Sequence, residues 1–159
     1  MANALRDIYE QNMESFLTQA AVLEVFKVIS RANKYIDETS PWVLAKDEKN
    51  RARLATVMYN LLETIRITTT LLQPVMPSSC EKAFAQIGAR QQDKAWENAK
   101  TFGILPSNVT VIKGDTLFPR IDLEKELAYL EELGAPKTQP EPEAVSVVTI
   151  DEFAKVRMT

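Results

Sequence analysis

A tryptophan that directly follows a proline is the residue whose type and position best suit binding chemistry. Trp42 follows Pro41 where a helical pattern ends, Tyr35 lies upstream, and lysines stand on both sides. A flat ring at the end of a helix can stack on an unpaired base, which contributes about 1–3 kcal/mol per base, while nearby cations bind phosphates. The alternative is that both aromatic side chains fill the core, which is the commoner fate of large aromatic residues. The segment is therefore either a nucleic-acid contact or a core plug.

Four cations follow the tryptophan closely: Lys46, Lys49, Arg51 and Arg53. They are candidate contacts for a phosphate backbone, which would run beside any base stacked on the indole. Asp47 and Glu48 lie among them, so the same stretch equally suits the solvated face of a helix. Upstream, Asn33 and Asp37 are four residues apart and share one helix face. We expect these two to fix the loop by hydrogen bonds rather than to contact a base edge.

Composition excludes several classes of chemistry. The 159 residues include no histidine, which removes Ser-His-Asp and Cys-His nucleophilic centres and histidine-ligated metal sites. The four glycines are too far apart for a phosphate-binding loop of the GxGxxG or GxxxxGK type. We therefore predict no catalytic residue, no metal site and no cofactor for this chain. A net charge of −3 gives no general attraction to nucleic acid, so any such binding must be local.

The same counts indicate a globular protein of a reducing compartment. Hydrophobic residues make up 45% and charged residues 26%, and no stretch approaches the roughly 20 apolar residues of a membrane span. Cys80 is the single cysteine, so it cannot form an internal disulfide, and we expect it to be buried. We predict a cytoplasmic protein that does not associate with membranes.

Helices must position the candidate residues, because apolar residues recur every three or four positions. The spacing predicts an all-α helical bundle, with Thr18 as an N-cap and a short turn around Trp96 packed on the bundle. The expected helices cover about 5–16, 18–38, 47–73, 78–88 and 123–133. The third should bury one apolar stripe, formed by Leu54, Val57, Met58, Leu61, Leu62, Ile65 and Leu72. The last should bury Leu123, Leu127 and Leu130.

The second half of the chain is less regular. The β-branched run Val109–Ile112 predicts a short irregular or strand-like segment. Residues 1–134 are expected to form one helical domain, and 135–143, with three prolines among polar residues, an extended linker. Residues 144–159 turn apolar again but are too few to bury a core of their own, so they are predicted to be the start of a further module.

Several of these segments resemble methionyl-tRNA synthetases. The resemblance rests on these stretches: Asn33-Lys34-Tyr35-Ile36-Asp37-Glu38, Pro41-Trp42, Ala45-Lys46, Leu72-Gln73-Pro74-Val75-Met76-Pro77 and Leu117-Phe118-Pro119-Arg120-Ile121-Asp122. It covers roughly 1–134 and corresponds to the helical anticodon-binding region that follows the catalytic domain in this family. Residues 149–156 are similar to the start of the tRNA-binding OB-fold that many bacterial members append.

The resemblance implies a noncatalytic fragment of an enzyme that attaches methionine to its tRNA with ATP. Trp42 would stack on the anticodon, Pro41 would set its orientation, and Asp37 would help to reject wrong anticodons. The family's earlier helix, with an Asn and an Arg that also read the anticodon, finds no match, and neither do its two ATP-binding signatures. The implied partners are the methionine tRNA and the catalytic domain of the parent chain, and we expect the fragment itself to be a monomer.

Two alternatives stay open. A helical protein-interaction scaffold would bury Trp42 and pair the basic cluster with acids on neighbouring helices. The other alternative is the equivalent domain of a leucine, isoleucine or valine synthetase, although the Asn-x-Tyr-Ile-Asp-Glu…Pro-Trp segment argues against it. Exposure of the indole separates the scaffold from the anticodon-binding hypothesis.

Overall fold

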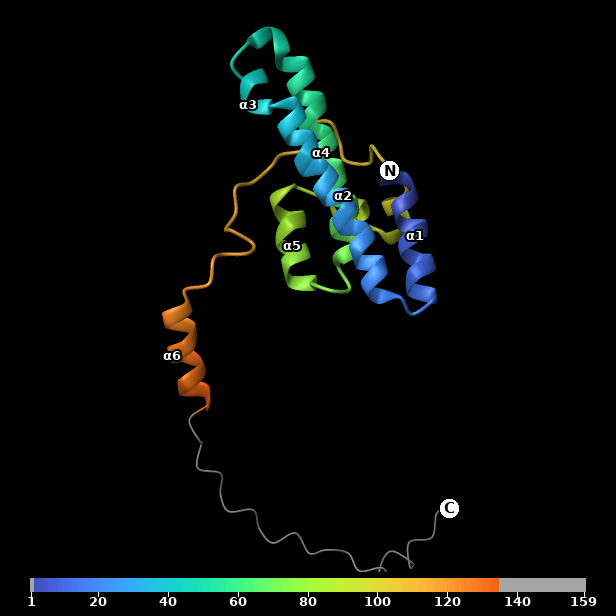
Figure 1. The fold of residues 1–159 in the computed structure, drawn as a ribbon. Helices are drawn as coiled ribbons and strands as arrows, with labels where there is room; N and C mark the ends of the chain where they lie inside the picture. The colour runs from blue at the N-terminus through green and yellow to red at the C-terminus, as the bar shows by residue number, and fades with distance from the viewer. Residues whose placement is uncertain (1, 135–159) are drawn as a thin grey trace, which may run out of the picture. The chain divides into compact units, whose positions relative to one another are not determined.

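A computed structural model describes residues 2–134 of the chain (Figure 1). The predicted linker at 135–143 and the predicted module start at 144–159 lie outside the described residues. The chain divides into two compact units, Met1–Phe118 and Pro119–Thr159. Each is considered by itself.

Helical segments follow one another along the described residues. In the first unit they are α1 (Ala2–Glu14), α2 (Thr18–Thr39), α3 (Pro41–Leu44), α4 (Arg51–Leu72) and α5 (Pro77–Gln86), with short 3-10 helices η1 (Glu48–Asn50), η2 (Gln91–Lys94) and η3 (Trp96–Lys100). The second unit contains α6 (Leu123–Gly134). No strand occurs within residues 2–134, and the prediction of an all-helical fold is confirmed.

The β-branched run at 109–112 is irregular, so the strand-like alternative is wrong. A strand needs a partner along its edge, and no other described segment pairs with this one. Instead, the main-chain amide of Ile112 donates to the carbonyl oxygen of Gln86 at the end of α5, with an N–O distance of 2.8 Å. The run therefore passes across the end of a helix.

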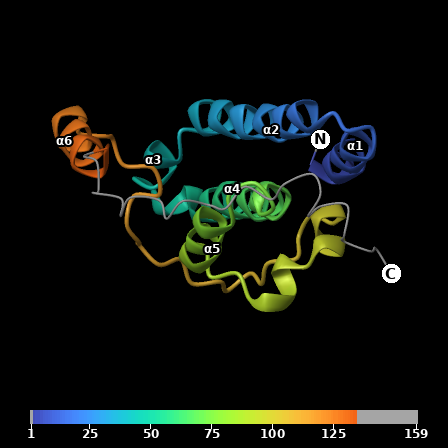
Figure 2. The ribbon, with the colours of Figure 1, turned by 90° about the horizontal axis from the view of Figure 1, so that it is seen from below.

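Helix α4 is the centre of the first unit. It contacts α1, α2, α3 and α5 and all three 3-10 helices, and Figure 2 shows α2 and α5 against different sides of it. On α2, buried Ala21, Val25 and Val28 recur at the expected helical spacing. The core also takes residues from α1, α4, α5 and its C-cap, η3 and the segment after η3: Leu5, Tyr9, Ile67, Leu71, Phe84, Ile87, Ala99 and Leu105.

Because partners surround the C-terminal end of α4, its last two turns are buried on every side. All seven residues of 66–72 are buried, four of them polar or charged. The single apolar stripe expected for this helix is therefore wrong in part, since Met58 and Ile65 are 44% and 40% exposed. A one-sided stripe is typical of a helix with partners on one side only.

Two charged side chains, Glu63 and Arg66, are fully buried in α4 and form a bidentate ion pair. The distances are 3.0 Å from Nε to Oε1 and 2.9 Å from Nη2 to Oε2. Arg66 also donates to three main-chain carbonyls, those of Asp93 (3.3 Å), Asn98 (3.1 Å) and Thr101 (2.7 Å). Glu63 accepts from two main-chain amides at 2.7 Å each, those of Gly103 and Leu105. The pair thus fastens the irregular segment 93–105 to the central helix.

The turn between α1 and α2 differs from its prediction. Phe16, expected on the apolar face of the first helix, lies beyond its end with φ +59° and is 92% exposed. Thr18 is the first residue of α2 and not its N-cap; Leu17 holds that position, without a side-chain cap. The main-chain amide of Leu17 instead closes the turn on the carbonyl of Asn12 at 2.8 Å. Main-chain bonds of the turn thus replace the expected hydroxyl cap.

In the second unit, α6 begins at the expected residue, but its leucines are not buried. Leu123, Leu127 and Leu130 are 68%, 49% and 58% exposed, which corrects the prediction. Within the described part of this unit, α6 is the only helix and has no second element to cover its apolar face.

Two expectations about single features can be checked directly. Cys80 is buried on α5, as predicted, and burial raises the pKa of its thiol. Among residues 2–134, no helix is both long enough and apolar enough to cross a bilayer.

Candidate nucleic-acid interface at the α2–α3 junction

Helices α2 and α3 are joined by a single residue, Ser40. Its φ of 45° and ψ of 62° are left-handed, so the chain turns sharply there. Its amide donates to the carbonyl of Ile36 at 2.8 Å, which closes α2, and its carbonyl accepts from the amide of Val43 at 2.8 Å, which opens α3. Pro41 is the first residue of α3, where a fixed φ and a missing N–H are tolerated. The expected loop is therefore a one-turn helix.

The indole of Trp42 is exposed at this turn. It is 55% exposed, and Val43 beside it is 53% exposed. The core-plug interpretation is wrong for Trp42, because a core residue of this size would be nearly covered. The scaffold alternative predicted a buried indole, and this prediction is wrong.

Tyr35 has a structural place instead. It is half-buried on α2, and its hydroxyl accepts a hydrogen bond of 3.3 Å from Nδ2 of Asn60 on α4. This bond ties α2 to α4 near the α2–α3 junction. Tyr35 thus helps to hold the frame on which Trp42 is presented.

The other tryptophan, Trp96, packs against the bundle as predicted. Its Nε1 donates to Oε1 of Glu10 at 2.7 Å, and its ring meets Tyr9 edge-on with centroids 5.8 Å apart. The guanidinium of Arg6 lies 5.3 Å from the ring centroid. The hydrogen bond from Trp96, followed by that from Arg6, lowers the pKa of Glu10. The two tryptophans therefore differ, since one is bonded into the frame and the other faces solvent.

The basic cluster extends from the end of α3 into the first turn of α4, and all four cations are exposed. Only Arg51 is paired, with Nη1 2.7 Å from Oε1 of Glu48. Lys46, Lys49 and Arg53 form no ion pair within the described part of the chain. Because α3 packs against α4, these cations lie at the same end of the bundle as Trp42 (Figure 1). The scaffold alternative predicted cations paired with acids on neighbouring helices, whereas the one pair found joins residues three positions apart in the sequence.

Asn33 and Asp37 are both exposed on the face of α2 that leads to the junction. The expectation that these two side chains fix the loop by hydrogen bonds is wrong, because within residues 2–134 neither side chain forms one. Only the main chain of Asp37 takes part: its carbonyl accepts from Oγ of Ser40 at 3.0 Å. The ion pair near this end of α2 joins Arg31 to Glu38 at 3.0 Å and does not involve Asp37. The side chains of Asn33 and Asp37 are thus exposed, and Asn33 lies at the edge of a pocket between α2 and α4.

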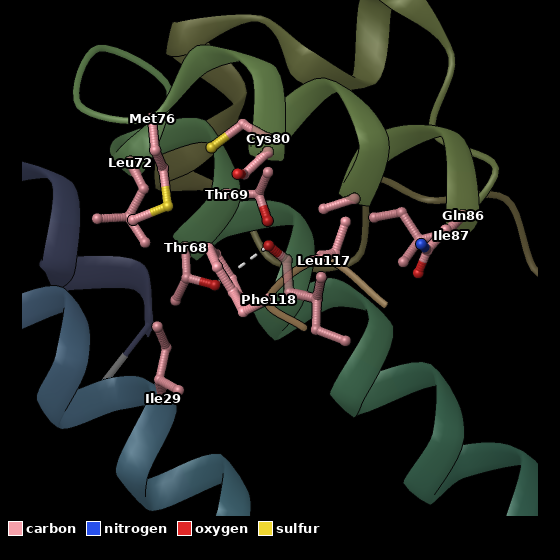
Figure 3. A pocket seen from close by; sticks show the side chains of 13 residues that line it. Ile29, Thr68, Thr69, Leu72, Met76, Cys80, Gln86, Ile87, Leu117 and Phe118 are labelled. Atoms are coloured by element: carbon pink, nitrogen blue, oxygen red, sulfur yellow. Dashed lines mark hydrogen bonds between the residues drawn. The ribbon is translucent and has the colours of Figure 1, made fainter. Parts of the chain in front are cut away.

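A pocket of about 320 Å³ lies elsewhere, between α2, α4 and α5, and was not foreseen (Figure 3). Its lining is largely apolar, with Ile29, Leu72 and Phe118 among its walls. The hydroxyl of Thr68 points to its own helix and donates to the carbonyls of Thr64 at 2.9 Å and Ile65 at 3.1 Å. No Asp, Glu, Lys or Arg lines the pocket. Its lining includes one titratable side chain, the thiol of Cys80, whose pKa burial raises. No group of three or more potential metal ligands occurs within residues 2–134.

Sequence reasoning placed the end of the helix at Ser40 and Pro41 but missed the left-handed conformation of Ser40. Ser40 in a left-handed conformation has no sequence signature comparable to that of glycine. The Ser-Pro step does signal the end of a helix, because the residue before a proline avoids the helical region.

Comparisons with known proteins agree on one family. Residues 1–138 match the family described as the anticodon binding domain of methionyl tRNA ligase. The methionine–tRNA ligase of Caldanaerobacter subterraneus subsp. tengcongensis is 45% identical over 99% of this chain, and that of Bacillus subtilis is 41% identical over 94%. These matches take in 25% and 24% of the two relatives. The chain thus spans about a quarter of the length of the curated relatives it matches.

Solved structures give the same answer. The apo form of the Mycobacterium tuberculosis methionyl-tRNA synthetase superposes with a TM-score of 0.68 and 27% identity, over 76% of this chain and 24% of that one. The same enzyme in complex with methionyl-adenylate also gives 0.68 and 27%, over 75% and 23%.

Proposed function

This chain belongs to the family of anticodon-binding domains of methionyl-tRNA ligases, and we propose that it reads the anticodon of the methionine tRNA with Trp42 as the stacking surface. The observation that carries the proposal is the exposed indole at the α2–α3 junction. A solvent-facing aromatic ring on a rigid turn is suited to an unpaired base, because stacking contributes about 1–3 kcal/mol per base and requires no particular edge of that base.

The cations at the same end supply contacts to phosphates. Lys46, Lys49 and Arg53 are exposed and unpaired within the described residues, so each can bind a phosphate without first breaking an ion pair. Arg51 must give up Glu48 to do the same. We therefore assign the backbone contacts chiefly to the first three. Their local charge offsets a chain whose net charge is −3.

Asp37 provides discrimination in this proposal. Its carboxylate is exposed on the face of α2 that leads to the junction. A carboxylate accepts hydrogen bonds from donor edges of a base and repels acceptor edges, so a base that presents acceptors to it is disfavoured. Pro41 limits the conformations of the turn and so holds the ring in one orientation.

The chain serves a larger enzyme in this proposal, since the relatives are about four times its length. The parent would join methionine to its tRNA with ATP, through the adenylate that the M. tuberculosis structure contains. ATP and methionine would be bound by the parent's catalytic domain. The chain itself contributes recognition and no catalytic group, acts in the cytoplasm, and is monomeric on its own.

The test is Trp42→Ala in the full-length enzyme. Loss of one stacked base predicts that kcat/KM for the cognate tRNA falls about 5- to 150-fold, corresponding to about 1–3 kcal/mol. Methionine-dependent ATP–pyrophosphate exchange should not change, because it does not require tRNA. Val43→Ala is the matched control, since Val43 lies on the same turn and is similarly exposed. A fall of less than about twofold for Trp42→Ala, or an equal fall for Val43→Ala, contradicts the assignment.

A further inference from the structure

Ser40 is an unusual residue for its conformation. Within the described residues, Phe16 and Ser40 are the two non-glycine residues with positive φ. A left-handed residue with a Cβ is disfavoured, and such residues persist where the surrounding structure over-determines them. Phe16 lies in the turn between α1 and α2, whereas Ser40 is two residues from the exposed indole.

All the polar groups of Ser40 are used to hold this conformation. Its amide and its carbonyl bond to α2 and α3, as described above, and the carbonyl also accepts from the amide of Leu44 at 3.3 Å. Its Oγ donates to the carbonyl of Asp37 at 3.0 Å. The adjacent Thr39 reinforces the end of α2, with Oγ1 donating to the carbonyl of Tyr35 at 2.6 Å. The junction is therefore closed by side chains as well as by the main chain.

No other residue separates the two helices, so the direction of α3 follows from the φ and ψ of Ser40. Pro41 has little freedom of its own, because its ring fixes φ. The orientation of Trp42 relative to α2 thus depends on one residue. The hydroxyl of the same residue is bonded to the main-chain carbonyl of Asp37, so the turn that directs Trp42 is also fastened to the main chain of the residue that carries the discriminating carboxylate.

We propose that Ser40 is the positioning residue of this site. It sets the direction of Trp42 and the position of the indole relative to Asp37. Glycine would accept the left-handed conformation more readily but would allow others and would lack the hydroxyl bond to Asp37. Serine restricts the turn at the expense of some strain. This inference rests on the proposed function of Trp42 and adds a residue to it.

The experiment compares four variants of Ser40 with Trp42→Ala in the full-length enzyme, with tRNA aminoacylation and ATP–pyrophosphate exchange as readouts. Ser40→Val disfavours the left-handed region through its branched Cβ, and we expect KM for tRNA to rise about tenfold with kcat nearly unchanged. Ser40→Gly, which can still make the turn, should raise KM about threefold. Ser40→Asn, which tolerates the same conformation and keeps a hydrogen-bonding side chain, should restore it to within about twofold. Exchange should stay unchanged in all three.

The fourth variant separates positioning from general stability. Adding Ser40→Val to Trp42→Ala should raise KM by less than about twofold beyond Trp42→Ala alone, because there is no ring left to orient. If the two effects multiply in full, Ser40 acts independently of Trp42 and the inference is wrong. The inference is also wrong if Ser40→Val leaves KM for tRNA unchanged while Trp42→Ala raises it. If the valine variant does not fold, Ser40→Gly takes its place in this comparison. If Trp42→Ala itself has no effect, the proposed function fails, and this inference with it.

Discussion

Replacing Arg66 with methionine should destabilise the chain more than any surface change, because it breaks a fully buried ion pair. The change keeps most of the side-chain volume but removes the guanidinium from Glu63 and from three main-chain carbonyls, those of Asp93, Asn98 and Thr101. Glu63, which is also fully buried, then keeps its charge with only two amides as partners. Removing one partner of a buried pair destabilises a protein by about 3–5 kcal/mol. For a unit of this size, that corresponds to a fall in Tm of about 12–20 °C.

The measurement is thermal unfolding of the chain, followed by circular dichroism at neutral pH. Arg51→Met is the matched control, since Arg51 also pairs with a glutamate three residues away but on the surface, and its Tm should change by less than about 2 °C. The double variant Glu63→Gln/Arg66→Met should recover at least about 1 kcal/mol over Arg66→Met, because it removes the unpaired buried charge. A fall of less than about 4 °C for Arg66→Met, or no recovery in the double variant, would refute the reasoning.

Two further predictions concern charge. Arg53→Ala should weaken tRNA binding by the full-length enzyme more than Arg51→Ala, because Arg51 is already paired with Glu48. In a salt titration, Arg53→Ala should also reduce the slope of the logarithm of the tRNA-binding constant against the logarithm of salt concentration by about 0.7. Equal effects of the two variants would contradict the assignment. Burial alone would raise the pKa of Glu63, but Arg66 and the amides of Leu105 and Gly103 outweigh it and hold the pKa below its ordinary value of 4.5. The stabilisation from this carboxylate is therefore complete above pH 4.5 and is lost as pH falls through the lowered pKa. The difference in Tm between the wild type and Arg66→Met should accordingly narrow in acid. A constant difference in Tm down to pH 3 would contradict this prediction.

The parts of the fold that depend on local pattern could be predicted, and the parts that depend on distant segments could not. Helix α2 was predicted because apolar residues from Val22 to Ile36 recur at helical spacing and because a proline ends the pattern. The exact buried face was not: Val25 of the predicted set is buried, but Phe26 is 44% exposed, and Ala21 and Val28 are buried instead. The burial of Glu63 and Arg66 depends on a segment some 30 to 40 residues away, which wraps around α4 and offers its carbonyls and amides. Nothing in the mixed apolar and polar sequence around Glu63 and Arg66 indicates that a distant segment will cover these two side chains.

The candidate site divides in the same way. The types of its residues, an aromatic ring beside cations, pointed to nucleic acid, but whether the ring was covered could not be read from spacing. Exposure of Trp42 depends on the turn at Ser40, where the side chain and the main chain together select a conformation that propensity disfavours. The left-handed conformation of Ser40 contradicts the local preference of a non-glycine residue, and only the tertiary structure shows why it is adopted.

The two groups of charges in this unit have opposite environments, and this difference connects the frame to the site. Glu63 and Arg66 are buried and mutually satisfied, so they fix one arrangement of the irregular segment on α4 and neutralise each other's charge. Lys46, Lys49 and Arg53 are exposed and unpaired within the described residues, so their field extends into solvent. Both groups depend on the same central helix, because α4 carries the buried pair and its first turn carries Arg53. A variant that loosens the buried pair should therefore weaken tRNA binding only to the extent that α4 unfolds, whereas a variant of the exposed cations should weaken binding in a fully folded protein.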